Sequence, residues 1–280
     1  MNNSAVNFTT SETSKDSITD SFWLWEIVKI CVFSINVLFG FPTHAYVIWL
    51  IISGTGSGVA SEFFNLNLSV CEIGTCLNCF LYIVSLCFPS ISNLLLFLQG
   101  LVFTGRPLFQ CLICVERYLA VVHPVTFLKY KSLRYRVICS ILSWMICLGS
   151  CFFCLFIDFI KHSQINAPVF SLQFLLVLSI QLFCLVAVLR TLKQSGPGER
   201  RGDRVEENHM KKRAFHLILI STVSMTIIDV PFIIAGLITI LTNQYFNFLW
   251  VTGVVCYVAA GFVQPVLYLQ RTRKLSCLCV

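Results

Sequence analysis

The sequence predicts an all-α integral membrane protein, a bundle of seven membrane-spanning helices, on three observations. Of the 280 residues, 57% are hydrophobic and only 12% are charged, whereas a soluble domain of this length carries about twice that charged fraction. The apolar residues form long runs, and Lys and Arg gather in the gaps between the runs. A hydrocarbon layer about 30 Å thick requires roughly 20 apolar residues per helix, and seven runs reach that length.

The runs divide the chain into a tail, a seven-helix domain and a short end. The expected spans are 24–52, 63–88, 92–122, 137–160, 169–192, 214–240 and 247–270. Residues 1–23 form a Ser/Thr/Asn-rich tail, residues 24–270 form the membrane domain, and residues 271–280 follow it. The first break, 53–58, reads SGTGSG and predicts a flexible turn, while 193–213 predicts one long polar loop.

The basic residues orient the chain in the membrane. Fifteen of the 20 lie in three segments, 123–136, 190–213 and 271–274, which an odd number of helices places on one side. Cytoplasmic loops carry the excess of Lys and Arg. We therefore expect a plasma-membrane protein with its N-terminus outside and its C-terminus in the cytoplasm. The net charge of +7 then indicates topology and contact with anionic membrane lipid, and not nucleic-acid binding.

The outer tail and the cysteines carry modest further information. Asn2 and Asn7 stand in N-x-S/T sequons, as glycosylation of an extracellular tail requires, while Asn67 stands in a sequon inside a span and should be unused. Most of the 15 cysteines lie inside apolar runs, where a thiol behaves as a small hydrophobe. We expect no metal site and no cofactor.

The inner end of the third run carries the strongest motif. It reads CLICVERYLAVVHP, and it resembles the E/D-R-Y signature of rhodopsin-like (class A) G-protein-coupled receptors. Further landmarks follow in the family's order: Glu72 for the second-helix aspartate, Trp144 in the fourth helix, Pro231 in the sixth, and QPVLY (264–268) for the seventh-helix N-P-x-x-Y. FGFPTHAYVIWLI (39–51) is similar to a run of peptide- and nucleotide-type receptors.

This resemblance implies a receptor mechanism and no enzyme activity. An extracellular ligand enters between the helices, the sixth helix moves outward at its inner end, and a heterotrimeric G protein docks there. The residues that the resemblance assigns to coupling and activation are Glu116, Arg117, Tyr118, Pro231, Gln264, Pro265 and Tyr268. Arg117 would contact the G protein in the active state and be held by Glu116 otherwise. Pro231 and Pro265 would act as hinges, and Tyr268 would swing inward.

The resemblance also extends to the last twelve residues. LQRTRKLSCLCV (269–280) looks like the short amphipathic eighth helix that follows N-P-x-x-Y, with Cys277 or Cys279 available for palmitoylation. The inner loop 193–213 either contacts the G protein or is a solvated basic loop.

The chain departs from the family at several places. Ser92 stands where the family keeps a disulfide cysteine, and 161–170 contains no cysteine either. Asp229 replaces the aromatic toggle ahead of Pro231, and Lys211 stands where an acid often restrains the E/D-R-Y arginine. The fifth helix lacks the usual proline and any tyrosine. These departures identify the chain as a divergent member of the family that it resembles.

The ligand is expected to be neutral or lipid-like. Gln99 stands where amine receptors keep an aspartate, and the outer halves of the third, sixth and seventh runs contain no Lys or Arg. The cavity therefore offers amides and aromatic rings, with Asn93, Gln99, Gln173 and Asp229 as candidate contacts.

Arg106 is the most unexpected residue in the apolar runs, because it places a full charge inside one of them. It precedes Arg117 by 11 residues, about 16 Å along a helix, and a charge near the bilayer centre costs roughly 2.5–3.5 kcal/mol. By the family alignment, Glu72 and Arg106 occupy the receptors' sodium site. We therefore expect the guanidinium to replace the sodium ion, with Glu72 as first partner and Asp229 or Gln264 completing its hydrogen bonds. Gly105 and Pro107 would let this helix bend.

Other classes of protein remain as alternatives. A receptor that binds ligand or acts as a scaffold without coupling fits the departures. A transporter or channel could use Glu72, Arg106 and Asp229 as an ion path, but the chain shows neither inverted repeats nor paired broken helices.

Overall fold

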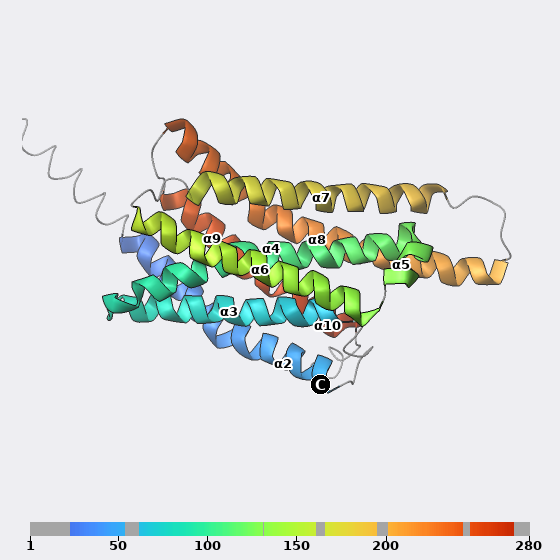
Figure 1. Cartoon of the computed structure of the whole chain (residues 1–280), viewed down its shortest axis with the longest axis horizontal. Coiled ribbons are helices and arrows are strands. Elements are labelled where there is room, and N and C mark those ends of the chain that lie inside the picture. The colour runs from blue at the N-terminus through green and yellow to red at the C-terminus, as the bar shows by residue number, and fades with distance from the viewer. Residues whose placement is uncertain are drawn as a thin grey trace, which may run out of the picture.

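A computed structural model of the chain describes residues 23–53, 62–130, 132–160, 166–194, 201–242 and 247–271. These residues are almost entirely helical, and the helices run side by side along the long axis of the molecule (Figure 1). Seven helices of this part are long and apolar enough to cross a membrane. The predicted all-α bundle is therefore confirmed.

The helix bounds follow the predicted runs closely in the middle of the chain. The first span covers Trp23–Ile52 and contains the π-helical turn η1 (Asn36–Gly40) and helix α2 (Phe41–Ile52). The remaining elements are α3 (Phe63–Ser85), η2 (Pro89–Ile91), α4 (Ser92–Val122), α5 (Pro124–Tyr130), α6 (Leu133–Phe159), α7 (Asn166–Gln194), α8 (Arg201–Thr242), α9 (Asn247–Gly261) and α10 (Val263–Arg271).

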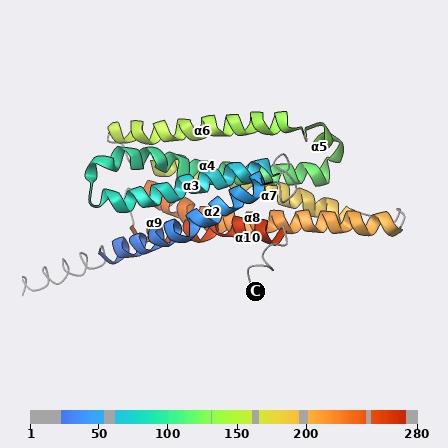
Figure 2. The same cartoon turned by 90° about the horizontal axis from the view of Figure 1, so that it is seen from below.

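Helix α4 is the centre of the bundle. It packs against α3, α6, α7 and α8, and more than half of its most apolar stretch is buried, a larger share than in any other described span. Figure 2 shows α6 along one edge of the bundle, beside α4. The third span can therefore bury polar residues such as Arg106 and Gln110, because neighbouring helices surround it on most sides.

Two features differ from the predicted elements. Helix α8 begins at Arg201, inside the predicted polar loop 193–213, because its charged first turns are rich in Glu, Lys and Arg, which form helix well outside the membrane. The basic connection 123–136 contains the short helix α5, which begins at Pro124; proline is well suited to the first position of a helix. The residues expected to form the eighth helix, with Cys277 and Cys279, and the tail with Asn2 and Asn7 lie outside the described residues.

The seventh span is interrupted where one continuous helix was expected. Helix α9 ends at Gly261 and α10 begins at Val263. Pro265 has no backbone N–H to donate to the carbonyl of Gly261, the acceptor four residues earlier. The turn tightens instead, and Phe262 N donates to the carbonyl of Ala259 at 3.3 Å.

Helices α4 and α6 approach most closely at Gly100. A Cβ atom at this position would lie 2.4 Å from the carbonyl oxygen of Ser150 and 2.5 Å from the nitrogen of Cys151, both backbone atoms. One turn further along, Thr104 Oγ1 donates to Ser150 Oγ at 2.8 Å. Small residues allow this approach in a membrane, where helix association depends on close packing and interhelical hydrogen bonds.

We predict that Gly100→Ala destabilises the bundle by about 1–3 kcal/mol, because the added methyl group must push two helix backbones apart. The measurement is the thermal midpoint of the purified protein, followed by reaction of its buried cysteines with a thiol-reactive dye. Gly149→Ala is the matched control, since nothing lies within 4 Å of a Cβ at that position of α6. An equal midpoint for the two variants would contradict the close approach.

Candidate functional site

Arg106 lies in the middle of α4 and is 3% exposed. The helix runs unbroken from Ser92 to Val122 although Gly105 and Pro107 flank the arginine. Pro107 has no N–H for the carbonyl of Phe103, four residues earlier. Gln173 of α7 donates its Nε2 to that carbonyl at 3.4 Å. The lost helical bond is thus replaced by a bond between helices.

The guanidinium of Arg106 forms a two-point ion pair with Glu72 of α3. Arg106 Nε donates to Glu72 Oε1, and Arg106 Nη2 donates to Glu72 Oε2 at 2.6 Å. Glu72 is 4% exposed, so both charges are removed from solvent. This fork-to-fork arrangement is the strong form of a charged hydrogen bond and one that lysine cannot make.

The third side of the guanidinium is covered by Tyr257 of α9. Arg106 Nη1 donates to the backbone carbonyl of Tyr257, and Arg106 Cζ lies 3.6 Å from the centre of the tyrosine ring. The hydroxyl of Tyr257 donates to the carbonyl of Val102 at 2.8 Å. Tyr257 therefore contacts both the guanidinium of Arg106 and the backbone of α4.

Gly261 provides the space for this cluster. A Cβ at position 261 would lie 2.7 Å from Arg106 Nη2 and 3.6 Å from Glu72 Oε2. Any side chain there would compete with the guanidinium for the same volume. We use the name buried ion-pair cluster for Glu72, Arg106, Tyr257 and Gly261.

Gln264, one of the two alternatives expected to complete the hydrogen bonds of Arg106, has a different partner. Gln264 Nε2 donates to Asn65 Oδ1 at 2.8 Å, and Asn65 Nδ2 donates to Glu62 Oε2 at 2.5 Å. Gln264 follows Tyr257 by seven residues, about 10 Å along a helix. Its side chain therefore meets α3 near the start of that helix, at Asn65, and not at Glu72. The side chain of Asp229 lies outside the described residues.

The end of the bundle that carries the E-R-Y motif, α5 and the start of α6 is called here the basic end. Glu116 forms an ion pair with Arg136 of α6, a partner that the sequence did not predict. The reason is the start of α6, which begins at Leu133 and not at residue 137. Arg136 thus lies inside a helix, 6% exposed, where a solvated loop charge was expected. Arg117 itself is half-buried.

The other motif residues at this end are packed against neighbouring helices. Tyr118 has its hydroxyl 3.2 Å from His123 Nε2, and its ring centre lies 5.8 Å from that of Phe183 on α7. Tyr268 is buried, and it packs in a cluster with Val47 and Leu50 of α2. Pro265 is buried three residues before it.

The opposite end of the core is an aromatic cluster around Phe232. Its ring centre lies 5.7 Å from those of Phe103 and Phe174, 5.6 Å from that of Trp250 and 6.5 Å from that of Tyr257. Sequence reasoning noted Asp229 in place of the aromatic toggle and missed Phe232. The available signal was its position, three residues after Asp229 and thus almost one helical turn away on a similar face.

The four candidate ligand contacts do not form one described site. Gln173 is bound to α4, since it also accepts from Thr104 Oγ1 at 3.4 Å. Asn93 is exposed at the start of α4, and Gln99 is half-buried six positions later, on a different side of the helix.

A seven-helix bundle with E-R-Y at the basic end of its central helix and Q-P-V-L-Y in its interrupted last span defines a class of membrane receptor. Residues 44–268 match the family described as 7 transmembrane receptor (rhodopsin family). The chain belongs to this family of G-protein-coupled receptors, and it is therefore a receptor and not an enzyme.

The chain is also similar to particular curated receptors. It is 24% identical over 232 residues to hydroxycarboxylic acid receptor 2 of Rattus norvegicus, an alignment that covers 71% of this chain and 59% of the relative. It is 25% identical over 242 residues to the protein of the same name from Homo sapiens, covering 74% and 62%. The chain thus spans about three fifths of the length of these relatives.

We predict that Arg106→Ala or Glu72→Ala alone prevents most of the protein from reaching the cell surface. Each leaves an uncompensated buried charge, which typically costs about 3–5 kcal/mol. The double variant Glu72→Gln with Arg106→Gln should recover part of the surface expression, because it removes both charges together. The measurement is surface labelling of a tagged receptor, normalised to total protein. Normal trafficking of both single variants would contradict the assigned role of the pair.

Proposed function

We propose that this receptor transmits the binding of an extracellular ligand to a heterotrimeric G protein through outward movement of α8, its sixth span. In this proposal the protein lies in the plasma membrane, its basic end faces the cytoplasm, and its N-terminus lies outside the cell. The bias of Lys and Arg supports this orientation. Glycosylation at Asn2 and Asn7 and palmitoylation at Cys277 or Cys279 belong to the same proposal.

The observation that carries the proposal is the placement of Glu116, Arg117 and Tyr118 at the basic end of the most buried helix of a rhodopsin-family chain. In the proposed mechanism Arg117 contacts the G protein once α8 has moved. Pro231 lies inside α8, and Pro265 follows the break at Phe262. Both prolines remove a helical hydrogen bond, which permits local bending. Gln264 and Tyr268 join α10 to α3 and α2 and would change partners in the active state.

The proposed ligand is neutral or lipid-like. The relatives are named for hydroxycarboxylic acids, but the outer halves of the third, sixth and seventh spans contain no Lys or Arg for a carboxylate. Arg106, in the middle of α4, already binds Glu72 and Tyr257. The aromatic cluster around Phe232 favours an apolar ligand, with Asn93, Gln99, Gln173 and Asp229 as its proposed polar contacts.

We further propose that the guanidinium of Arg106 takes the place of the sodium ion that the family holds between its second, third and seventh helices. The supporting geometry is the bond of Arg106 to Glu72 on α3 and to the carbonyl of Tyr257 on α9. Unlike sodium, this cation is covalently attached and cannot dissociate.

A second candidate function is a receptor that binds ligand without coupling. The ion pair of Glu116 with Arg136 favours it, since the E-R-Y acid is also held by a basic residue of α6. A transporter is disfavoured because Glu72 and Arg106 neutralise each other and leave no evident ion path.

We predict agonist-dependent nucleotide exchange on purified G proteins when the full chain, reconstituted in liposomes, is screened against a library of neutral lipids, sterols and carboxylates. A neutral compound should be the activator, and Arg117→Ala should reduce exchange at least about tenfold, because the arginine contacts the G protein directly. Arg134→Ala is the control, an exposed arginine of α6 near the same end. Compound binding without exchange would support the non-coupling receptor, solute flux without ligand would support the transporter, and activation by carboxylates alone would refute the neutral ligand.

We predict that sodium does not stabilise the protein relative to other monovalent cations. The guanidinium of Arg106 already neutralises Glu72, so sodium has no binding site there. Replacing sodium by another cation therefore leaves the stability of the protein unchanged. The measurement is the thermal midpoint in sodium chloride against choline chloride at equal ionic strength. A midpoint raised by sodium in the unmodified chain would show that the cation site is still open. The Glu72→Gln, Arg106→Gln variant serves as the comparison without either charge.

A further inference from the structure

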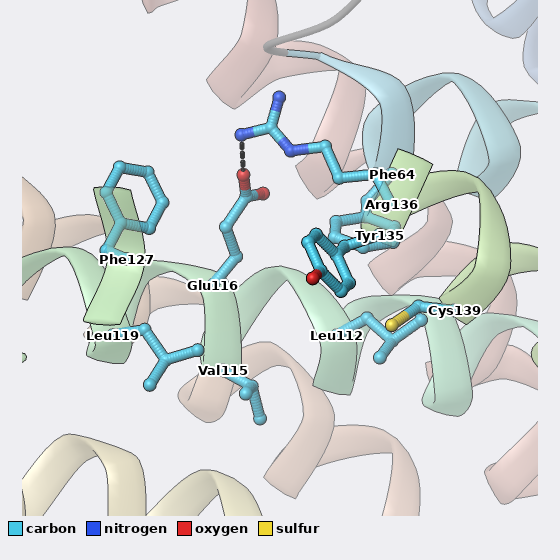
Figure 3. Close-up of a pocket in the computed structure, with 9 residues that line it drawn as sticks. All are labelled: Phe64, Leu112, Val115, Glu116, Leu119, Phe127, Tyr135, Arg136 and Cys139. Carbon is cyan, nitrogen blue, oxygen red and sulfur yellow. Dashed lines mark hydrogen bonds and ion pairs between the residues drawn. The ribbon is translucent and has the colours of Figure 1, made fainter. Parts of the chain in front are cut away.

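A pocket of about 270 Å³ lies at the basic end, between α3, α4, α5 and α6. Its wall is formed mostly by apolar side chains such as Phe64, Leu112 and Phe127, which Figure 3 shows together with the remaining lining residues. The mechanism proposed above does not use this pocket.

The two charged lining residues are bound to each other. Glu116 and Arg136 form the ion pair drawn as a dashed line in Figure 3, and their side chains are 12% and 7% exposed. Their charges are neutralised within the wall, so the pocket offers a polar ligand little to bind. Its volume is also below the roughly 300–1,000 Å³ typical of pockets for drug-sized molecules. A slender apolar group fits these two properties best.

The pocket opens on the side of α6 that faces lipid. Cys139 and Tyr135 line it, and both are exposed. Their neighbours Ile138 and Leu142 are 52% and 58% exposed, and a helix face of this composition is stable only against hydrocarbon. Lipid is therefore the molecule that reaches the opening first.

Two exposed basic residues stand within two positions of residues that line the pocket, Phe127 and Tyr135. Lys129 at the end of α5 and Arg134 at the start of α6 are both exposed. Helix α5 also exposes Val125 and Leu128, by 81% and 69%, as a short helix does when its apolar side is immersed in the membrane interface. An acyl chain in the pocket would thus place its headgroup next to two positive charges.

We propose that this pocket binds one acyl chain of an anionic phospholipid from the membrane leaflet at the basic end, with Lys129 and Arg134 contacting the headgroup. The charge of the rim selects the headgroup, and the apolar wall holds the chain. The site lies outside the helix core in which the extracellular ligand is proposed to bind. Binding there requires a membrane-embedded chain and is independent of coupling to a G protein.

The test is photo-crosslinking of the full chain in phosphatidylcholine nanodiscs. The probe is phosphatidylserine with a diazirine on its acyl chain, compared with phosphatidylcholine carrying the same chain. Mass spectrometry should locate the phosphatidylserine label on the segments 112–119 and 127–139, above the phosphatidylcholine label by roughly fivefold, as expected when a basic residue attracts an anionic lipid.

Two variants separate the pocket from ordinary lipid contact. Cys139→Trp should fill the opening and remove the label, whereas Cys31→Trp, at another exposed cysteine of the first span, should leave it unchanged. Lys129→Gln with Arg134→Gln should reduce labelling by phosphatidylserine to the level of phosphatidylcholine. Because both of these residues are exposed, this variant tests the site even where the tryptophan prevents folding.

Three results would overturn the proposal. The first is equal labelling of the unmodified chain by the two phospholipids. The second is a pocket label that survives Cys139→Trp in folded protein. The third is stronger labelling of the same segments by a diazirine-bearing sterol, which would assign the pocket to a different lipid. Because no G protein is present, none of these outcomes depends on whether the receptor couples.

Discussion

The rest of the structure depends on the ion pair between Arg106 and Glu72. A full charge near the middle of a membrane helix is tolerated only where protein groups replace its hydration, so α4 must keep α3 on one side and α9 on the other. The same segment of α4 is also bound to α7 through the carbonyl that Pro107 leaves free and to α9 through the hydroxyl of Tyr257. Arg106 and Pro107 therefore cause α4 to be bonded to α3, α7 and α9 within one short segment.

Helix α8 is joined to this core differently. Gln110 of α4 donates to Ser224 at 3.2 Å, a neutral contact, and the ring of Phe232 packs among the aromatic side chains. Neutral bonds and ring contacts are weaker than charge-assisted ones. In the proposed activation α8 changes position while α3, α4 and α9 keep theirs, and these neutral contacts of its described residues are among those that would change. Phe232 also packs in the core against Phe103, Phe174 and Trp250, and in the proposed mechanism a ligand would act on α8 through it.

The architecture and the ion pair could both be predicted from the sequence. Some helix bounds and some partners of Arg106 could not. The spans were predictable because a hydrocarbon layer imposes length and composition on each helix, and Glu72 and Arg106 could be paired because an intramembrane charge requires a partner. Tyr257 contributes a backbone carbonyl, which every residue possesses and which therefore leaves no signal in the sequence. Gln264 was assigned to Arg106 on a continuous last helix, whereas the chain breaks at Phe262. Arg136 was assigned to a loop because hydropathy detects where a helix enters lipid and not where it begins.

The bond from Arg106 to the carbonyl of Tyr257 has a consequence that a sodium ion would not have. A free ion can leave when the helices around it move, so its loss is part of the change between states. A tethered guanidinium remains, and any displacement of α9 relative to α4 must break its bond to α9 or move both helices together. A conformational change is favoured only by interactions that differ between its two states. The energy that sodium release supplies elsewhere must here come from the ligand, from the G protein, or from a new partner for the same guanidinium donor. The ring of Tyr257 stacks on the same guanidinium, so a displacement of α9 affects both contacts of Tyr257.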